Sequence, residues 1–129
     1  MEAYGRHGPG SIGGRAEDRA LTHLEQAGLT LLERNFRCRS GEIDLIMRDG
    51  ATLVFVEVRM RRQSRFGTAA ESIDTRKLRK IRSAADFWLR CAWNGTSKTR
   101  IDVVTLDGSD SRTARIAWLR GVDDTGAGW

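Results

Sequence analysis

Two acidic residues stand where strand residues should be apolar. Asp44 interrupts the apolar run 43–47, and Glu57 interrupts the run 53–58. An Asp-Gly pair lies between the runs, which is typical of a hairpin turn. Residues of that hairpin pair when their numbers sum to about 99–101, so Asp44 lies opposite Glu57 or one step away. Two carboxylates on half-buried strands repel each other and lose hydration, which favours a cation or a proton between them.

A third carboxylate lies on the buried side of the helix predicted over residues 14–27. Apolar residues recur there at helical spacing, and Gly28 is suited to end the helix. Glu17 falls on the same side as Leu24, whereas Asp18 is about 100° further round and should point elsewhere. Acidic residues also favour the first turn of a helix for stability alone. The local sequence therefore leaves a functional and a structural role for Glu17 equally open.

The net charge of +5 is concentrated in one segment of the chain. Residues 59–82 hold nine Lys and Arg against two acids, so the rest of the chain is slightly acidic. A charge run is usually a solvated face, but cations in the first turns of a helix oppose its dipole and suit phosphate better than they suit stability. We therefore expect a polyanion partner. The candidate nucleic-acid-binding residues are Arg61, Arg62, Arg76, Lys77, Arg79 and Lys80.

The hydrophobic pattern as a whole predicts one domain of the α/β class. We expect helices over residues 14–27 and 76–92, the second capped by Asp74 or Thr75, and strands over residues 29–37, 41–48, 51–60, 100–106 and 114–119. The resulting order, αβββαββ, indicates a mixed central sheet flanked by helices. Residues 1–13 are predicted to be a flexible N-terminal tail, residues 14–120 a single domain, and residues 121–129 a frayed C-terminal tail.

Several classes of protein are disfavoured by composition. No apolar run is long enough to span a membrane, and no secretory signal is evident, so we expect no membrane partner. Cys38 and Cys91 lack CxxC partners and suit reduced thiols in a cytoplasmic protein. Asp102 is expected to be structural, paired with a neighbouring Arg. Trp93 and Trp118 suit either the core or an interface, which leaves a homodimer open.

Asp44 followed by Glu57-Val58-Arg59, with an acidic residue on a preceding helix, resembles the motif of the PD-(D/E)xK nuclease superfamily. The segments GRAEDRA, GEIDLI, LVFVEVRMR and RIDVV resemble the YraN family more closely, over residues 13–106. This resemblance implies a restriction-endonuclease-like fold, similar to that of archaeal Holliday junction resolvases. It also implies an endonuclease that acts on DNA, with branched DNA of recombination or repair among its candidate substrates.

The resemblance further implies a metal site and a catalytic role for each motif residue. Asp44, Glu57 and the main-chain carbonyl of Val58 would bind Mg²⁺, with Mn²⁺ as a substitute, and Glu17 would act through a metal-bound water. Arg59 occupies the position where the motif calls for Lys. A guanidinium can clamp phosphate and stabilise negative charge, but it cannot deprotonate water. Lys77, in the first turn of the second helix, could supply a lysine from a different backbone position.

Three functions follow from these residues. The first is a Mg²⁺-dependent endonuclease on DNA. The second is a catalytically weak or inactive DNA-binding accessory module, because Arg59 replaces the expected Lys. The third is a protein without nucleic-acid function, in which Asp44 and Glu57 are structural ion-pair partners of Arg59 and Arg61.

Overall fold

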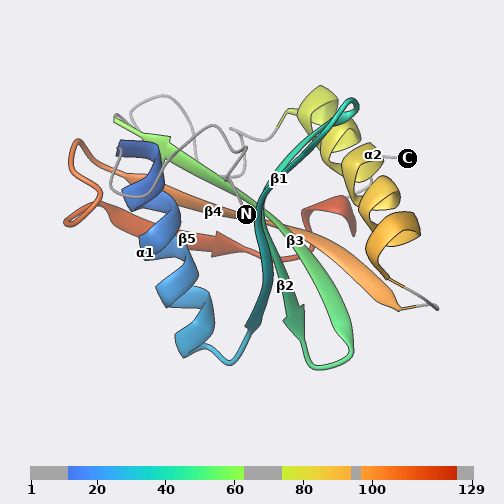
Figure 1. Ribbon diagram of the computed structural model, residues 1–129. Coiled ribbons are helices and arrows are strands. Elements are labelled where there is room, and N and C mark those ends of the chain that lie inside the picture. Colours follow the sequence, from blue (N-terminus) through green and yellow to red (C-terminus); the bar gives the residue numbers. More distant parts are fainter. Residues whose placement is uncertain (1–11, 63–73, 94–96, 125–129) are drawn as a thin grey trace.

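The computed structural model describes residues 12–62, 74–93 and 97–124. Its elements are, in chain order, α1 (Ile12–Gln26), β1 (Thr30–Cys38), β2 (Gly41–Asp49), β3 (Thr52–Arg61), α2 (Thr75–Ala92), β4 (Lys98–Asp107), β5 (Arg115–Leu119) and a short 3-10 helix (Val122–Asp124) (Figure 1). The predicted order αβββαββ is confirmed. The first helix begins two residues earlier than expected, and the rest of the predicted N-terminal tail lies outside the described residues.

The five strands form one mixed sheet in the order β1-β2-β3-β4-β5. β3 and β4 run parallel, and the other neighbouring pairs run antiparallel. Parallel neighbours need a crossover connection, and α2 lies on the one that joins β3 to β4. α1 covers one face of the sheet and α2 the other (Figure 1). This arrangement confirms the expected α/β class and is consistent with a restriction-endonuclease-like core.

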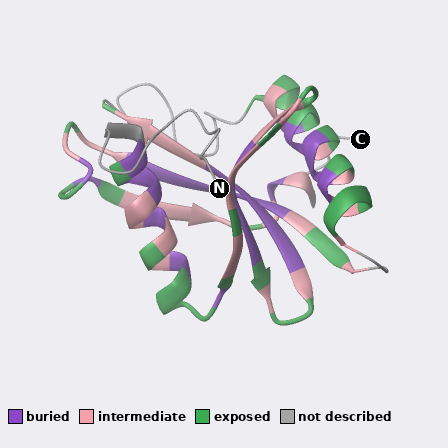
Figure 2. Cartoon of the chain, viewed as in Figure 1, coloured by how far each residue is buried: buried purple, intermediate pink, exposed green. Residues whose placement is uncertain are grey.

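The central strand β3 is buried on both faces, as its apolar sequence predicted (Figure 2). Val54 and Val56 belong to the core beneath α1, whereas Leu53 and Phe55 belong to the core beneath α2. Side chains alternate between the faces of a strand, so Glu57 is on the α2 side. The strand that supplies the candidate acidic residue is therefore held in place by packing from both helices.

The two helices begin and end largely as their sequences indicate. Gly28 adopts a φ of +102°, the left-handed conformation that favours Gly after a helix. Asp74 caps α2, and its Oδ1 accepts a hydrogen bond from the backbone N–H of Arg76 at 2.9 Å. The three- and four-residue spacing of apolar residues over 76–92 predicts a buried stripe that includes Ala92, but Ala92 is exposed at the very end of α2 and Ala84 is buried. Ala84 precedes Ala85 and lies within the width of the same buried stripe.

The chain after β5 returns to the sheet. Val122 is 4% exposed and packs in the core beneath α2. Asp123 Oδ1 accepts a hydrogen bond from the backbone N–H of Ile101 at 3.0 Å. Residues 121–124 are thus attached to the sheet and are not frayed, contrary to the expectation for the C-terminal tail. Residues 125–129 lie outside the described residues.

A two-pronged ion pair joins the ends of β3 and β4. Arg61 Nε and Nη2 donate to the two carboxylate oxygens of Asp107 at 2.6 and 2.8 Å. This hydrogen bonding lowers the pKa of Asp107 and raises that of Arg61. Asp107→Asn should therefore lower the free energy of unfolding by about 1–2 kcal/mol at neutral pH.

The same pair predicts a pH dependence of stability. A carboxyl whose pKa is lowered by folding stabilises the native state above its unfolded pKa, about 3.9 for Asp, and loses that effect as the pH falls through its folded pKa. The difference between wild type and Asp107→Asn should thus be full at pH 7 and shrink below about pH 4. Urea denaturation across this range measures it, with Asp86→Asn, at a half-exposed position, as the control. An equal difference at pH 3 and pH 7 would contradict the assignment.

Candidate functional site

The C-terminal end of β3 lies against the first turns of α2, and a cavity of about 350 Å³ opens there. Glu57 and Arg59 line it from β3, and Lys77 lines it from α2. Lys77 Nζ lies 3.5 Å from Glu57 Oε2, and Glu57 is 5% exposed. The structure therefore brings together Glu57, Arg59 and Lys77. It places the alternative lysine beside the acidic residue of the motif.

Asp44 lies where β2 and β3 stop pairing through their backbones. The last backbone pair towards this end is Leu45 with Val56, in the predicted register, and its continuation sets Asp44 opposite Glu57. At this position Asp44 Oδ2 accepts a hydrogen bond from the backbone N–H of Val58 at 2.8 Å. A strand residue directs its N–H and C=O to the same neighbour, so the carbonyl of Val58 also faces β2. The predicted juxtaposition of Asp44 with the Glu57-Val58 segment is present.

Glu17 is buried, as predicted, but residues of β1 bind it. Its carboxylate lies 3.4 Å from Arg34 Nη2, and the same guanidinium reaches Asp18 at 2.9 Å. With the amide nitrogen of Asn35 turned towards it, that nitrogen lies 3.1 and 3.3 Å from the two oxygens of Glu17. Asn35 has a φ of +55°, a left-handed conformation that Asn tolerates better than most residues. Glu17 and Asp18 therefore both attach α1 to the edge strand.

Two of the candidate carboxylates are arranged so that they could bind a metal ion. Within residues 12–62, 74–93 and 97–124, no three or more His, Cys, Asp or Glu side chains are grouped so that they could hold a metal. A site for Mg²⁺ would thus rest on two carboxylates, Asp44 and Glu57, without Glu17 as a third. Mg²⁺ commonly binds through one or two carboxylates and keeps several waters, so this pair fits. The ammonium of Lys77 beside Glu57 indicates that the position accepts a positive charge.

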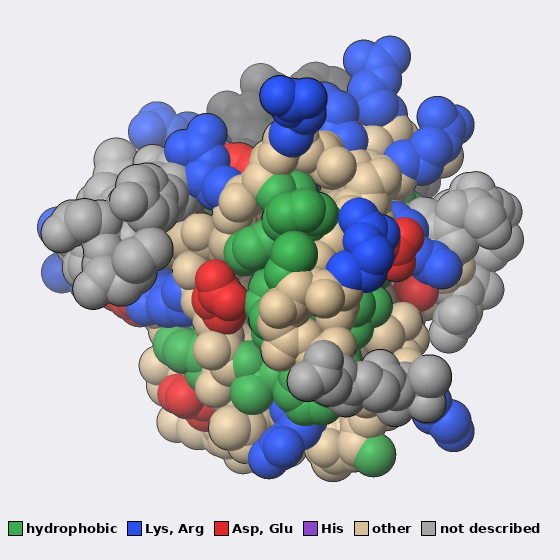
Figure 3. Space-filling model, turned by 45° about the vertical axis from the view of Figure 1, so that its right-hand side comes forward, with side chains coloured by type: hydrophobic (Ala, Val, Ile, Leu, Met, Phe, Trp, Pro, Cys, Tyr) green, Lys and Arg blue, Asp and Glu red, His purple; other side chains and the backbone are tan. Residues whose placement is uncertain are grey.

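The six predicted nucleic-acid-binding residues have different environments. Arg61 is committed to Asp107 through two hydrogen bonds, and Lys77 turns towards Glu57. The other four are exposed, namely Arg62, Arg76, Arg79 and Lys80. Lys and Arg side chains line the upper part of the face turned forward in Figure 3, around a band of hydrophobic side chains. The exposed cations of α2 remain candidates for contacts with a polyanion.

Asp102 is structural, as predicted. It is fully buried, and Arg100 Nε donates to its Oδ1 at 3.0 Å. Trp118 Nε1 donates to Oδ2 at 2.9 Å, and the backbone N–H of Gly121 donates to Oδ1 at 2.9 Å. Trp93 stacks on Trp88 with ring centroids 6.0 Å apart. Trp93 and Trp118 are therefore half-buried parts of the fold.

Two expectations about the class of protein concern cysteines and membranes. Cys38 is half-buried, Cys91 is exposed, and both are free thiols. Among the described helices, none combines the length and the apolar character required to cross a membrane.

The structure contains a second group of cations that the sequence pattern did not indicate. Arg15, Arg19 and Arg112 line a cavity between α1 and the loop that joins β4 to β5. Arg15 and Arg19 are four residues apart and share a helix face, which is a signal that could have been noticed. Arg112 joins them through tertiary structure alone, and no sequence spacing indicates that contact.

Known proteins resemble this chain over most of its length. Residues 16–106 match the family described as uncharacterised protein family UPF0102. A UPF0102 protein of Pseudomonas fluorescens is 47% identical over 111 residues, which cover 85% of this chain and 90% of that protein. One of Alkalilimnicola ehrlichii is 52% identical over 109 residues, covering 84% and 82%, and one of Nitrosomonas europaea is 48% identical over 115 residues, covering 89% and 95%. The chain therefore belongs to the UPF0102 family, the YraN family that its motifs indicated.

Proposed function

We propose that this protein is a Mg²⁺-dependent endonuclease that hydrolyses phosphodiester bonds of DNA, with branched DNA of recombination or repair among its candidate substrates. The observation that carries the proposal is the convergence of Glu57, Arg59 and Lys77 on one cavity at the end of β3. Asp44 supports it, because its carboxylate is hydrogen-bonded to Val58, which lines the same cavity. Acidic and basic groups side by side suit a site that takes both a cation and a phosphate.

Asp44, Glu57 and the carbonyl of Val58 would hold Mg²⁺ in this proposal, with Mn²⁺ as a substitute. A bound divalent metal lowers the pKa of water and offsets negative charge on a phosphate. Burial of both carboxylates, and the hydrogen bond from Val58 to Asp44, keep the donor atoms in place. Glu17 would act indirectly, through a metal-bound water. Its carboxylate is contacted directly by Arg34 and Asn35.

Arg59 and Lys77 share the tasks that the motif assigns to one lysine. The guanidinium of Arg59 binds two phosphate oxygens at once and stabilises the charge that develops on them. It stays protonated, so it takes no proton from the attacking water. The ammonium of Lys77 approaches the same cavity from α2 and can orient a water or a phosphate oxygen.

The alternative function is DNA binding without turnover, and the guanidinium at position 59 is the observation that favours it. Both functions predict an affinity for DNA, and they differ in the effects of two substitutions. If Lys77 supplies the lysine function, Lys77→Met should lower cleavage by about 100-fold or more, and Arg59→Lys should keep it within about tenfold of wild type. If the protein is inactive, wild type should cut nothing and Arg59→Lys should create cleavage.

The experiment uses a labelled panel of linear, nicked, flap and four-way DNA in Mg²⁺ or Mn²⁺. Wild type, Arg59→Lys and Lys77→Met are compared under single-turnover conditions, and binding is measured separately in EDTA. Cleavage by wild type that Lys77→Met abolishes would support the endonuclease. Failure of wild type to cut any member of the panel in either metal would contradict it.

The proposal extends to the setting in which the protein works. A four-way junction presents two strands to be cut, so its resolution requires two sites and hence a homodimer. Sedimentation of the protein with and without a junction tests that part. The free thiols of Cys38 and Cys91 suit the reducing cytoplasm, where the DNA would be met.

A further inference from the structure

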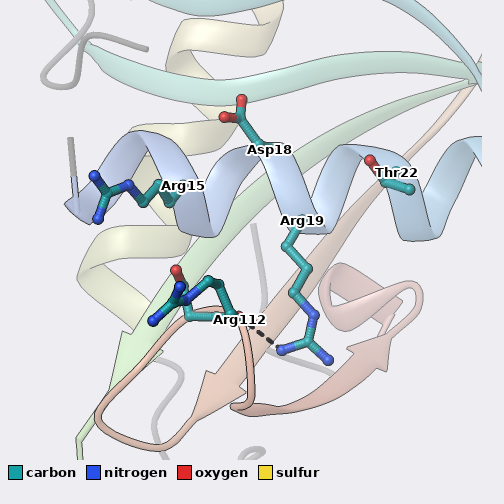
Figure 4. Close-up of a pocket in the computed structure, with 6 residues that line it drawn as sticks. Arg15, Asp18, Arg19, Thr22 and Arg112 are labelled. Atoms are coloured by element: carbon teal, nitrogen blue, oxygen red, sulfur yellow. Dashed lines mark hydrogen bonds between the residues drawn. The ribbon is translucent and has the colours of Figure 1, made fainter. Parts of the chain in front are cut away.

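A row of cavities extends from the candidate site to the N-terminal half of α1. A cavity of about 420 Å³ is lined by Arg15, Arg19 and Thr22 of α1 and by Arg112 of the loop after β4 (Figure 4). A second cavity, of about 210 Å³, shares Arg15 and Arg112 and reaches Arg62 at the end of β3. We call the two together the arginine groove.

The arginine groove adjoins the candidate site. Met60 lines both the second cavity of the groove and the cavity that contains Glu57. From Arg59 to Arg62 the chain spans about 10 Å, a length that corresponds to about three base-pair steps along the axis of a DNA duplex. The N-terminal turns of α1 and the end of β3 lie at the same edge of the molecule (Figure 1). One strand of DNA could therefore touch both places.

The lining of the groove carries more positive than negative charge. Its two carboxylates each have an arginine partner, since Asp18 pairs with Arg34 at 2.9 Å and Asp110 pairs with Arg112 at 2.9 Å. Arg112 remains 83% exposed in spite of that pair. Arg15 and Arg62 are exposed, and neither forms an ion pair with another residue in the described part of the chain. The groove therefore holds cations that an external anion can reach.

The wall of the groove is fixed by hydrogen bonds. Arg19 reaches from α1 to the loop and donates to the carbonyl of Ser111 at 2.8 Å (Figure 4). It also donates to the carbonyl of Ala114. Within the loop, Arg112 donates to Asp110 from its side chain and its backbone and lowers the pKa of that carboxyl to about 2, with a smaller effect from the charge of Arg15. The cations thus lie on a surface that hydrogen bonds hold in place, and this surface joins α1 to a loop far from it in sequence.

We propose that the arginine groove binds phosphates of the DNA strand next to the phosphate at the candidate site. The DNA then crosses the end of β3, from the N-terminal turns of α2 to those of α1, and does not lie along α2 alone. This inference rests on the proposed function for the identity of its ligand. It adds a binding surface that Arg15, Arg62 and Arg112 supply, outside the cavity that contains Glu57 and Lys77.

The test is the affinity for a short fluorescein-labelled duplex in EDTA, measured by anisotropy between about 50 and 200 mM salt. The double variant Arg15→Gln/Arg62→Gln should bind about tenfold or more weakly than wild type, and its salt slope should be shallower by about two. The control Arg48→Gln/Arg90→Gln removes the same charge from two exposed residues away from the groove. Arg48 lies on β2 opposite Leu53, near the start of β3, and Arg90 lies in the last turn of α2. It should bind within about twofold of wild type.

A second variant protects the test against misfolding. Thr22→Glu adds a carboxylate to the groove at an exposed position of α1 and leaves every arginine in place, and it should also weaken binding. Equal affinities for the groove variants and the control pair would overturn the inference, as would wild type that binds no DNA. Groove variants that bind weakly while wild type never cuts DNA in Mg²⁺ would instead support the groove and reject the endonuclease.

Discussion

Glu57→Gln is expected to reduce cleavage of DNA in Mg²⁺ by at least about 100-fold. The substitution keeps the shape of a side chain that is 5% exposed but removes its charge, so the proposed metal site would lose a charged ligand. It also removes the counter-charge that lies 3.5 Å from Lys77 Nζ. Asp44→Asn should have a similar effect, because the negative charge is lost. The amide oxygen can still accept the hydrogen bond from the N–H of Val58, so the local structure is kept. The measurements are single-turnover cleavage and calorimetric titration with Mg²⁺.

Affinity for DNA and stability separate this effect from a general loss of structure. Both variants should keep their affinity for DNA in EDTA, because the cations of the surface are unchanged. Glu25→Gln, on the exposed side of α1, is the matched control and should cut DNA at the wild-type rate. Cleavage that survives both Glu57→Gln and Asp44→Asn would show that the site is elsewhere.

Asp102→Ala should have the largest effect on stability, a loss of about 3–5 kcal/mol in the free energy of unfolding. The carboxylate is fully buried and accepts hydrogen bonds from Arg100, Trp118 and the backbone of Gly121. Its removal takes one carboxylate away from the partly buried guanidinium of Arg100. It also leaves the Nε1–H of Trp118 and the N–H of Gly121 without their acceptor. Arg100 also reaches Asp49 at 3.0 Å, so the turn between β2 and β3 loses support as well.

Chemical and thermal denaturation measure this loss. The midpoint of thermal unfolding should fall by about 10 °C or more in a domain of this size. Asp86→Ala, which removes a half-exposed partner of Arg82 on α2, should change stability by less than about 0.5 kcal/mol. A loss below about 1 kcal/mol for Asp102→Ala would mean that the network around it adds little.

Local patterns predicted the central part of the site. The alternation of β3 assigns Glu57 to the face opposite Val56, and the Asp-Gly turn sets Asp44 opposite Glu57. Both follow from rules that act over a few residues. The capping of α2 by Asp74 follows in the same way and explains why Lys77, three residues later, stands at the start of that helix.

Contacts that depend on tertiary structure could not be predicted from the sequence. The distance from Lys77 to Glu57 is set by how α2 packs on the sheet. The partners of Glu17 depend on an irregular strand, because the register between β1 and β2 shifts at Leu31 and Glu33 shortly before Asn35 takes its left-handed conformation. The arginine groove brings α1 to a loop more than ninety residues later in the chain.

The parallel pairing of β3 with β4 has a consequence for the order of folding. Hairpins with short turns bring β1, β2 and β3 together, and these local contacts form quickly, so Asp44 and Val58 can meet early. α2 and β4 reach β3 through longer connections than a hairpin turn, and closing a longer loop is slower. A chain caught between these stages holds Asp44 and Glu57 without Lys77 beside them. The candidate site is therefore complete only when α2 has packed against β3.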